Sequence, residues 1–313
     1  MASFLVTGGA GFIGSALVHR LLDLGHSVRV VDNFSTGFRR NLDNCLDRIE
    51  LVEGDLAELA VCEASAQGVE YVLHQAAIPS VQRSVEDPLS SHRANVTATL
   101  NMLVAARNAQ VKRFVFASSS SVYGDSETLP KVETMPEKPL SPYALTKLAG
   151  EKYCELFHRI YGLATVSLRY FNVFGPRQDP HSPYSAVISR FVEAALRGRR
   201  PIVYGDGEQS RDFTYVDDVV EANLLACHAD DLGGMVFNAG TGRRHTLNNL
   251  LSSLSTIVGR PLEPEYSNPR VGDVRHSQAG IEKAQRFLKF KSKVSFQEGL
   301  ERTVDWFRKS LKP

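Results

Sequence analysis

The sequence predicts an α/β fold in which helices cover both faces of a doubly wound parallel sheet. Two observations carry this prediction. Short apolar, β-branched runs alternate with helical stretches up to about residue 170, a rhythm that is typical of successive β-α-β units. A turn rich in glycine follows the first run, at the place where sheets of the Rossmann type hold the phosphates of a nucleotide.

The apolar runs predict strands at 4–6, 28–31, 49–52, 71–73, 114–116 and 165–168. Helical periodicity is found at about 12–24, 89–109 and 142–161. Beyond residue 172 Pro and Gly become frequent, and loops separate the helices expected near 184–197 and 216–228. We therefore expect a nucleotide-binding domain over 1–172, to which segments near 211–240 return. A smaller C-terminal region, 173–313, is expected mainly to bind substrate.

The amino-acid composition limits which binding partners and which cellular compartment we expect for this protein. Lys and Arg number 36 against 35 Asp and Glu, so no basic field favours nucleic acid or an anionic membrane. The four cysteines lie far apart, without the spacing of a zinc site or of a disulfide framework. No signal-like segment and no apolar run of about 20 residues is found. We expect a cytoplasmic protein without a metal site or a membrane anchor.

The glycine-rich turn contains Gly8, Gly11 and Gly14 and opens a helix. Glycines let the backbone approach a pyrophosphate, and the free N–H groups and dipole of the helix attract its charge. Asp32 ends the second strand, where a carboxylate accepts from both ribose hydroxyls and repels a 2′-phosphate. This pattern predicts NAD rather than NADP. The alternative is a glycine-rich turn with a capping Asp.

Two further segments follow strands on the same side. Asp55 comes after the third strand, where it is expected either to bind the adenine amino group or to cap a helix. The sequence leaves both interpretations open. Gln75, Ala76 and Ala77 come after the fourth strand and offer small residues where a dinucleotide would pass.

Tyr143 and Lys147 form the expected catalytic pair. Ser141 is the predicted N-cap and Pro142 the first residue of their helix, and a spacing of four places both side chains on one face. A nearby ammonium favours the ionised phenol, whose pKa is ordinarily about 10, and so prepares a base for an alcohol. The alternative is an amphipathic helix with an exposed Tyr and Lys.

A run of serines, residues 118–121, follows the fifth strand at its carboxyl end. Ligands of such sheets bind at this end. Ser119 or Ser121 is therefore expected to hold the reacting hydroxyl beside Tyr143.

At this point the chain resembles the extended short-chain dehydrogenase/reductase family, and most of all its UDP-sugar 4-epimerases. The matching segments are 7–14, 32–33, 54–56, 121–124, 143–147, 169–172, 211–213 and 238–242. The resemblance implies that Tyr143 takes the proton of the sugar 4-hydroxyl while the C4 hydride passes to NAD. The 4-keto sugar then turns over, and the hydride returns to its other face. Lys147 would tune Tyr143, and Ser121 would relay or orient the proton.

The resemblance also implies which residues bind each ligand. For NAD, these are Gly8, Gly11, Phe12, Ile13, Gly14, Asp32, Asn33, Ser35, Thr36, Gly37, Asp55, Leu56, Gln75, Ala76, Ala77, Asn95, Ser119, Tyr143, Lys147 and Phe171. For the UDP-sugar, they are Ser119, Ser120, Ser121, Tyr143, Asn172, Gln178, Ala186, Val187, Tyr204, Arg211, Arg270, Asp273 and Ser277. The arginines suit a diphosphate because their planar fork matches its oxygens.

At several positions the chain differs from related enzyme families, and these differences argue against some of the reactions that those families catalyse. Sugar-nucleotide dehydratases and decarboxylases resemble this chain but have Glu where Ser121 stands, and the dehydratases also have Asp where Ser120 stands. Elimination needs that acid and base. UDP-glucuronate 4-epimerases usually have Thr at the position of Asn172 and a basic residue near Asp179, where a carboxylate would not attract a uronic acid.

The position of Ser277 bears on the sugar, because in the family a Tyr there fills the space beside C2 and a small residue leaves room for an acetamido group. The sequence thus predicts a UDP-hexose 4-epimerase that favours UDP-GlcNAc and UDP-GalNAc, with UDP-Glc and UDP-Gal as further substrates. The alternatives are a UDP-glucuronate 4-epimerase, another nucleotide-sugar oxidoreductase, or a non-catalytic dinucleotide sensor. The family's dimers suggest a homodimer.

Overall fold

The computed structural model describes residues 1–180, 187–268 and 274–310. Its centre is a seven-stranded parallel sheet with the order β11-β6-β5-β4-β1-β2-β3. The strands are β1 (Ser3–Thr7), β2 (Ser27–Asp32), β3 (Ile49–Glu53), β4 (Tyr71–His74), β5 (Arg113–Ser119), β6 (Thr165–Tyr170) and β11 (Met235–Ala239). The predicted fold class and the six predicted strands are confirmed. The strand order reverses between β1 and β4, so their carboxyl ends flank a site typical of nucleotide binding.

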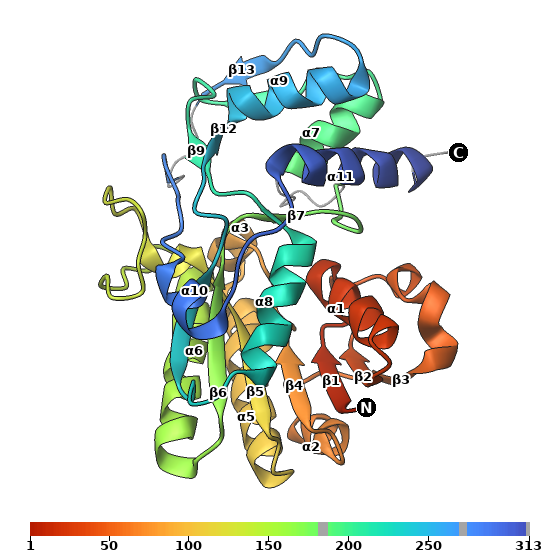
Figure 1. Ribbon diagram of the computed structural model, residues 1–313, viewed down its shortest axis with the longest axis vertical. Helices are drawn as coiled ribbons and strands as arrows, with labels where there is room; N and C mark the ends of the chain where they lie inside the picture. The colour runs from red at the N-terminus through yellow and green to blue at the C-terminus, as the bar shows by residue number, and fades with distance from the viewer. Residues whose placement is uncertain (181–186, 269–273, 311–313) are drawn as a thin grey trace.

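Helices cover both faces of the sheet because successive strand residues point to opposite sides. Phe4 and Val6 pack on the side of α1 (Phe12–Asp23) and α8 (Val216–His228). Leu5 packs on the side of α2 (Leu59–Ala66), α5 (Ala98–Asn108) and α6 (Pro142–Tyr161). Figure 1 shows α8 in front of the sheet with α5 and α6 behind it.

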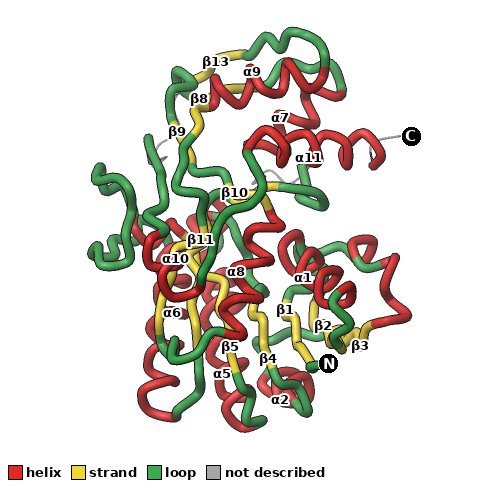
Figure 2. Tube along the Cα trace, in the orientation of Figure 1, coloured by secondary structure: helices red, strands yellow, loops and turns green. Residues whose placement is uncertain are grey.

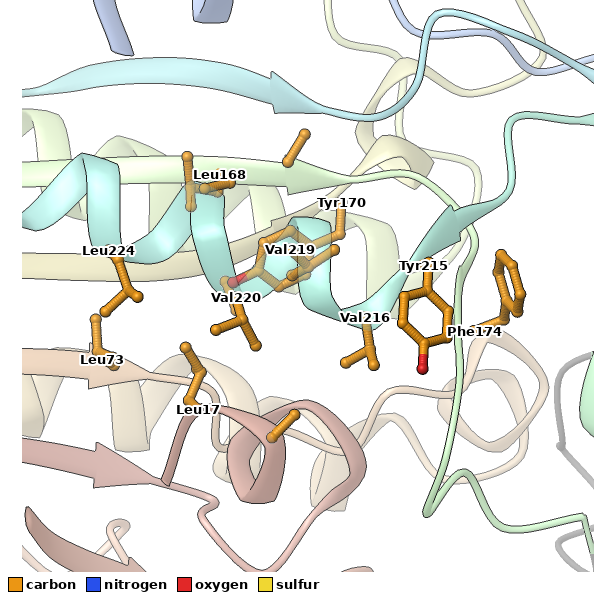
Figure 3. Close-up of a cluster of buried hydrophobic side chains, with 14 of the residues drawn as sticks. Leu17, Leu73, Leu168, Tyr170, Phe174, Tyr215, Val216, Val219, Val220 and Leu224 are labelled. Atoms are coloured by element: carbon orange, nitrogen blue, oxygen red, sulfur yellow. The ribbon is translucent and has the colours of Figure 1, made fainter. Parts of the chain in front are cut away.

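Helix α8 joins the sheet to the rest of the molecule. Figure 3 shows Val219 and Val220 of α8 directed at the apolar side chains of the sheet and of α1, among them Leu73, Leu168 and Leu17. All of these side chains are buried. The start of α8 therefore has a fixed position at the carboxyl edge of the sheet.

A second group of elements lies beyond the carboxyl ends of the strands (Figures 1 and 2). Its helices are α7 (Val187–Leu196), α9 (Leu247–Val258) and α11 (Phe296–Ser310). Short strands pair around them: β8 (Ile202–Tyr204) with β13 (Glu265–Ser267), β9 (Ser210–Arg211) with β12 (His245–Thr246), and β7 (Val173–Phe174) with β10 (Thr214–Tyr215). We call this group the cap.

The predicted helix at 89–109 is present in pieces. Helix α3 (Val81–Glu86) precedes α4 (Pro88–His92), a π-helical turn (Arg93–Thr97) and α5. Helix α10 (Glu282–Leu288) packs on β11. Within the described ranges no helix combines the length and the apolar character needed to span a bilayer.

Candidate active site

The glycine-rich turn brings β1, α1 and the end of β4 so close together that a side chain at its glycine positions would clash with the neighbouring backbone. Gly8 has a φ of +64°, and a Cβ on it would lie 2.8 Å from the backbone of Ala76. A Cβ on Gly14 would lie 2.1 Å from the carbonyl oxygen of Gly8. Gly11 is the N-cap of α1, and among the described residues no side chain caps this helix. Its first N–H groups therefore remain available to a phosphate.

Asp32 fixes the same turn from the end of β2. Its carboxylate accepts from the N–H of Ala10 at 2.9 Å and from the N–H of Phe34 at 2.8 Å. Burial raises the pKa of Asp32, and these backbone hydrogen bonds oppose the rise. Each carboxylate oxygen has a further lone pair, so Asp32 can hold the turn and still accept from a ribose.

The loop after β2 lies against the glycine-rich turn. The Asn33 side chain accepts from the N–H of Ser35 at 3.1 Å. Ser35 and Thr36 are exposed, whereas Gly37 is buried where a Cβ would lie 2.9 Å from the backbone of Ala10. The remaining predicted residues of this region, Phe12 and Ile13, open α1 and are half-buried.

Asp55 does not cap a helix. Its Oδ1 accepts from the N–H of Ala57 at 2.9 Å, within a turn, and its other oxygen lies 3.4 Å from Arg93 Nη2. The N-cap of α2 is Glu58. The capping interpretation of the sequence is therefore wrong, because the helix begins three residues later than the Asp suggests. The half-exposed carboxylate stays available to a ligand.

At the end of β4 the backbone is held by a buried hydroxyl. Thr7 Oγ1 accepts from the N–H groups of Gln75 and Ala76, both at 3.1 Å, and lies 2.8 Å from His74 Nδ1. Gln75, Ala76 and Ala77 are half-buried at the carboxyl edge of the sheet. This segment thus faces the glycine-rich turn across the point where the strand order reverses.

Three predicted cofactor residues have buried side chains. Asn95 accepts from the N–H of Ile78 at 2.8 Å and donates to Thr146 Oγ1 at 3.0 Å, so its amide ties the end of β4 to α6. The Phe171 ring is fully buried and Leu56 is 5% exposed. Their side chains therefore pack inside the protein.

Helix α6 begins as its sequence predicts. Ser141 is the N-cap and its Oγ accepts from the N–H of Ala144 at 3.1 Å, with Pro142 at the first position. The remaining N–H of this first turn, that of Tyr143, donates to Ser84 Oγ of α3 at 3.0 Å. The start of α6 is thereby fixed to a neighbouring helix, which limits how far Tyr143 can move.

Lys147 is buried rather than exposed, so the interpretation of an ordinary amphipathic helix does not hold. Its residue is 4% exposed, and Nζ donates to the carbonyl oxygen of Ala117 on β5 at 2.8 Å. Nζ lies 6.0 Å from the centre of the Tyr143 ring. Burial lowers the pKa of Lys147 to about 8, while the charge of Glu151 opposes the change.

The hydroxyl groups of three residues meet in front of β5. Ser121 Oγ donates to Ser119 Oγ at 2.9 Å. The Ser119 hydroxyl in turn acts on the Tyr143 phenol and lowers its pKa. Ser120 begins the short 3-10 turn that carries Ser121. Ser119 and Ser121, the two serines expected to hold the reacting hydroxyl, are thus joined to each other by a hydrogen bond.

The sequence-based expectation for the Tyr143 pKa is wrong for this structure. Burial raises the pKa of Tyr143 above its ordinary value, and the hydrogen bond with Ser119 only partly opposes this. The ammonium of Lys147 is drawn toward the Ala117 carbonyl. Desolvation therefore outweighs the attraction of the cation.

A cavity of about 230 Å³ opens between the sheet and the cap. It brings together four predicted substrate residues: Asn172, Val187, Tyr204 and Arg211. Asn172 has a φ of +33° and donates to the carbonyl oxygen of Asp212 at 3.3 Å. The cavity joins side chains from β8, β9 and α7 to the end of the sheet, which suits a long ligand.

Sequence reasoning missed part of this cavity. Arg190 and Gln209 supply polar groups to its lining, and Ile188, Phe191, Ile202, Phe213 and Leu247 supply apolar ones. Arg190 stands three residues after Val187 on α7, the spacing that places two side chains on one helix face. That spacing was the available signal.

Other predicted substrate residues lie elsewhere or outside the described ranges. The Gln178 amide donates to the carbonyl oxygen of Val173 at 3.0 Å. Ser277 lies beside β9, with its N–H donating to the carbonyl oxygen of Ser210 at 3.0 Å. Ala186, Arg270 and Asp273 fall outside the residues that the structure describes.

Asp212 joins the sheet to the cap. Its buried carboxylate accepts from the N–H and hydroxyl of Thr241 at 2.9 and 2.7 Å, from the N–H of Gly242 at 2.9 Å and from the N–H of Ala279 at 3.0 Å. Four donors satisfy a charge that would otherwise be costly to bury. Arg211 and Phe213, which line the cavity on either side, are held in place as a result.

The doubly wound sheet, the glycine-rich turn and the buried Lys beside a Tyr define a short-chain dehydrogenase/reductase of the extended type. Residues 4–240 match the model of the NAD dependent epimerase/dehydratase family. The chain belongs to this family, in which NAD is the cofactor.

Relatives cover the whole chain. The UDP-glucose 4-epimerase of Mycolicibacterium smegmatis is 41% identical over 97% of this chain and 98% of its own length. The crystal structure of the UDP-glucose 4-epimerase of Thermotoga maritima with UDP-glucose has a TM-score of 0.94 and 43% identity, covering 99% of this chain and 100% of its own. The UDP-N-acetylglucosamine 4-epimerase of Methanobrevibacter ruminantium, in complex with UDP-N-acetylmuramic acid, has a TM-score of 0.95 and 41% identity, covering 99% of each chain.

Proposed function

We propose that this chain is an NAD-dependent 4-epimerase of UDP-hexoses that favours UDP-GlcNAc and UDP-GalNAc and also accepts UDP-Glc and UDP-Gal. One observation carries the proposal. The phenol of Tyr143 is joined through Ser119 to Ser121, while Lys147 lies buried on the same helix face. The relatives with names of UDP-sugar 4-epimerases support the same reaction.

The residues at the carboxyl edge of the sheet fit NAD. Gly8 and Gly14 leave no room for a Cβ, so the backbone at this turn can approach a pyrophosphate. The uncapped N-terminus of α1 supplies N–H groups and a favourable dipole. Asp32 would accept from the adenosine ribose, and Lys147 from α6 would donate to the nicotinamide ribose. Bound NAD supplies a reversible acceptor for the hydride of sugar carbon 4.

The chain's own residues move the proton. Tyr143, once ionised, takes the proton of the 4-hydroxyl, and Ser121 orients that hydroxyl. The buried ammonium of Lys147 stabilises the phenolate through space. After the 4-keto sugar has turned over, Tyr143 returns the proton to the oxygen on carbon 4. The same acid and base therefore serve both directions, and no net oxidation results.

The cavity supports binding of the UDP part of the substrate. Arg211 and Arg190 bring two guanidinium groups to its lining, where they suit a diphosphate. Tyr204 offers an aromatic face to a base. Ser277 has a small side chain beside β9, and in this proposal it would leave room for a substituent on C2 of the sugar. The preference for N-acetylated sugars rests on this residue.

Purified protein incubated with UDP-GlcNAc, UDP-Glc or UDP-GlcA tests the proposal. We expect UDP-GalNAc and UDP-Gal to form without added NADH and without accumulation of NADH, with UDP-GlcNAc the better substrate by kcat/KM. Stoichiometric NADH formation would instead indicate a net oxidoreductase. Conversion of UDP-GlcA alone would indicate a uronate epimerase, and absence of any epimer would refute the proposal.

A further inference from the structure

We propose that Glu151 is a positioning residue that holds Lys147 in its charged form beneath Tyr143. The inference rests on the proposed function, which assigns Lys147 its role. Tyr143, Lys147 and Glu151 follow one another at intervals of four on α6 and therefore form one line along a single helix face. Both Lys147 and Glu151 are buried there, with exposures of 4% and 2%.

Consecutive residues of β5 hold the two charged side chains. The carbonyl oxygen of Ala117 accepts from Lys147 Nζ at 2.8 Å. The hydroxyl of Ser118, the next residue, donates to Glu151 Oε1. The strand thus fixes the ammonium and the carboxylate at consecutive residues, and Ser119 is the next residue of the same strand.

Arg169 of β6 holds the Glu151 carboxylate with two parallel hydrogen bonds. Its Nε donates to Oε1 at 2.9 Å and its Nη2 to Oε2 at 2.7 Å. Both side chains are 1% exposed. Such a bidentate pair holds the carboxylate in one orientation. The Arg169 guanidinium also lies 4.6 Å from the centre of the Tyr123 ring and 3.2 Å from Glu137, so it is itself fixed.

Among the residues that the structure describes, the groups that face Lys147 leave Glu151 as its counter-charge. His74 on β4 is buried, and burial lowers its pKa to about 3, so it is neutral at physiological pH. Phe116 of β5 presents a ring 5.1 Å from Nζ. Tyr143 has a raised pKa and is uncharged in this state. Burial lowers the pKa of Lys147 to about 8, and the anion that opposes this is Glu151.

Arg169 has a second consequence for the design of a test. Removing Glu151 alone would leave a buried guanidinium without its partner, which is strongly destabilising. Glu151→Gln combined with Arg169→Met removes both charges together. Gln can still accept from Ser118, and the Met thioether can pack on the Tyr123 ring. Glu155→Gln is the matched control, because it removes the same charge from an exposed position one turn further along α6.

The experiment titrates Lys147 directly and compares the pH profiles of catalysis. Lysine labelled with ¹³C at Cε reports the titration by NMR, with the Lys147 signal assigned by its loss in Lys147→Arg. In the double variant we expect the midpoint for Lys147 to fall by about one pH unit or more. The apparent pKa of the basic limb in the pH profile of kcat should fall with the Lys147 midpoint, while KM for the UDP-sugar changes by less than about twofold. Glu155→Gln should leave the midpoint and the profile unchanged.

A folded double variant with an unchanged Lys147 midpoint would show that Glu151 has a structural role alone and would overturn the inference. If the double variant does not fold, Glu151→Asp decides, because it keeps the ion pair but withdraws the carboxylate by one methylene. A lower midpoint supports the inference and an unchanged one refutes it. Loss of the proposed function is distinguishable, since wild-type protein would then lack epimerase activity while the NMR titration still reports on Lys147.

Discussion

The ammonium nitrogen of Lys147 lies 6.0 Å from the centre of the Tyr143 ring and is held by the carbonyl oxygen of Ala117. A strand carbonyl, rather than the phenol, thus determines where the cation stands. The cation acts on Tyr143 through space, in a buried region where charge interactions are stronger than in water. The Ser119 hydroxyl also acts on the phenol and lowers its pKa, while burial raises it.

Tyr143→Phe removes the phenolic oxygen and leaves the ring in place. We expect turnover of UDP-GlcNAc to fall by about 10²-fold or more, because proton transfer loses its base. Chromatographic separation of the epimers measures it. Tyr161→Phe is the control, since it deletes the same atom from the exposed end of the same helix. Equal loss of activity in both variants would contradict the role of Tyr143.

Asp32→Asn should weaken binding of NAD and reduce its preference over NADP. The amide loses the charge that repels a 2′-phosphate and places an NH₂ where one oxygen accepts from Ala10 or Phe34. We expect the Kd for NAD to rise by about tenfold or more. Calorimetry on protein stripped of nucleotide measures both cofactors. Asp43→Asn, at an exposed position that begins the 3-10 helix Asp43–Arg48, should bind as wild type.

Ser277→Tyr should lower kcat/KM for UDP-GlcNAc relative to UDP-Glc by more than about tenfold, because the added ring occupies the space proposed for the acetamido group. Competition between the two substrates in one reaction gives this ratio directly. Ser267→Tyr places the same side chain at an exposed position on β13 and should leave the ratio as it is. An unchanged ratio in Ser277→Tyr would remove the basis for the sugar preference.

The buried, neutral imidazole of His74 leads us to expect that the free energy of unfolding falls in acid. Its folded-state pKa of about 3 lies below the ordinary value, so the unfolded chain binds a proton first as the pH falls. The stabilisation is complete above about pH 6.5 and declines between about pH 6.5 and 3, by up to about 1.4 kcal/mol per pH unit.

Urea unfolding at several pH values above about 4.5 checks this expectation. His74→Gln keeps a donor for Thr99 but cannot be protonated, so its stability should depend less on pH in this window. His92→Gln, at an exposed position of α4, should retain the wild-type dependence. Parallel curves for wild type and His74→Gln would contradict the assignment.

Local signals explain which parts of the site could be predicted from sequence. The N-cap at Ser141 and the proline after it are decided within one helical turn, and the structure has both. The close approach of Gly14 to Gly8 likewise depends on residues six apart. Neither needs information about the rest of the fold.

Features that depend on distant segments were not predictable in the same way. Burial raises the pKa of Tyr143, opposite to the expectation, because burial depends on how α3 and β5 pack around the helix. Arg190 and Gln209 line the cavity, but neither belongs to a sequence motif that would have indicated this position. Of the two interpretations left open for Asp55, the capping role is wrong because the chain makes one more turn before α2 begins.

The edge strand β11 pairs with β6, yet 64 residues of chain separate the end of β6 from the start of β11. This intervening segment contains β7, α7, β8 and α8. During synthesis on a ribosome, β6 must therefore wait for its outer neighbour until residue 239 has emerged. Until then its outer row of N–H and C=O groups is open to pairing with other chains. A fragment ending at residue 172 would keep that exposed edge permanently and should aggregate.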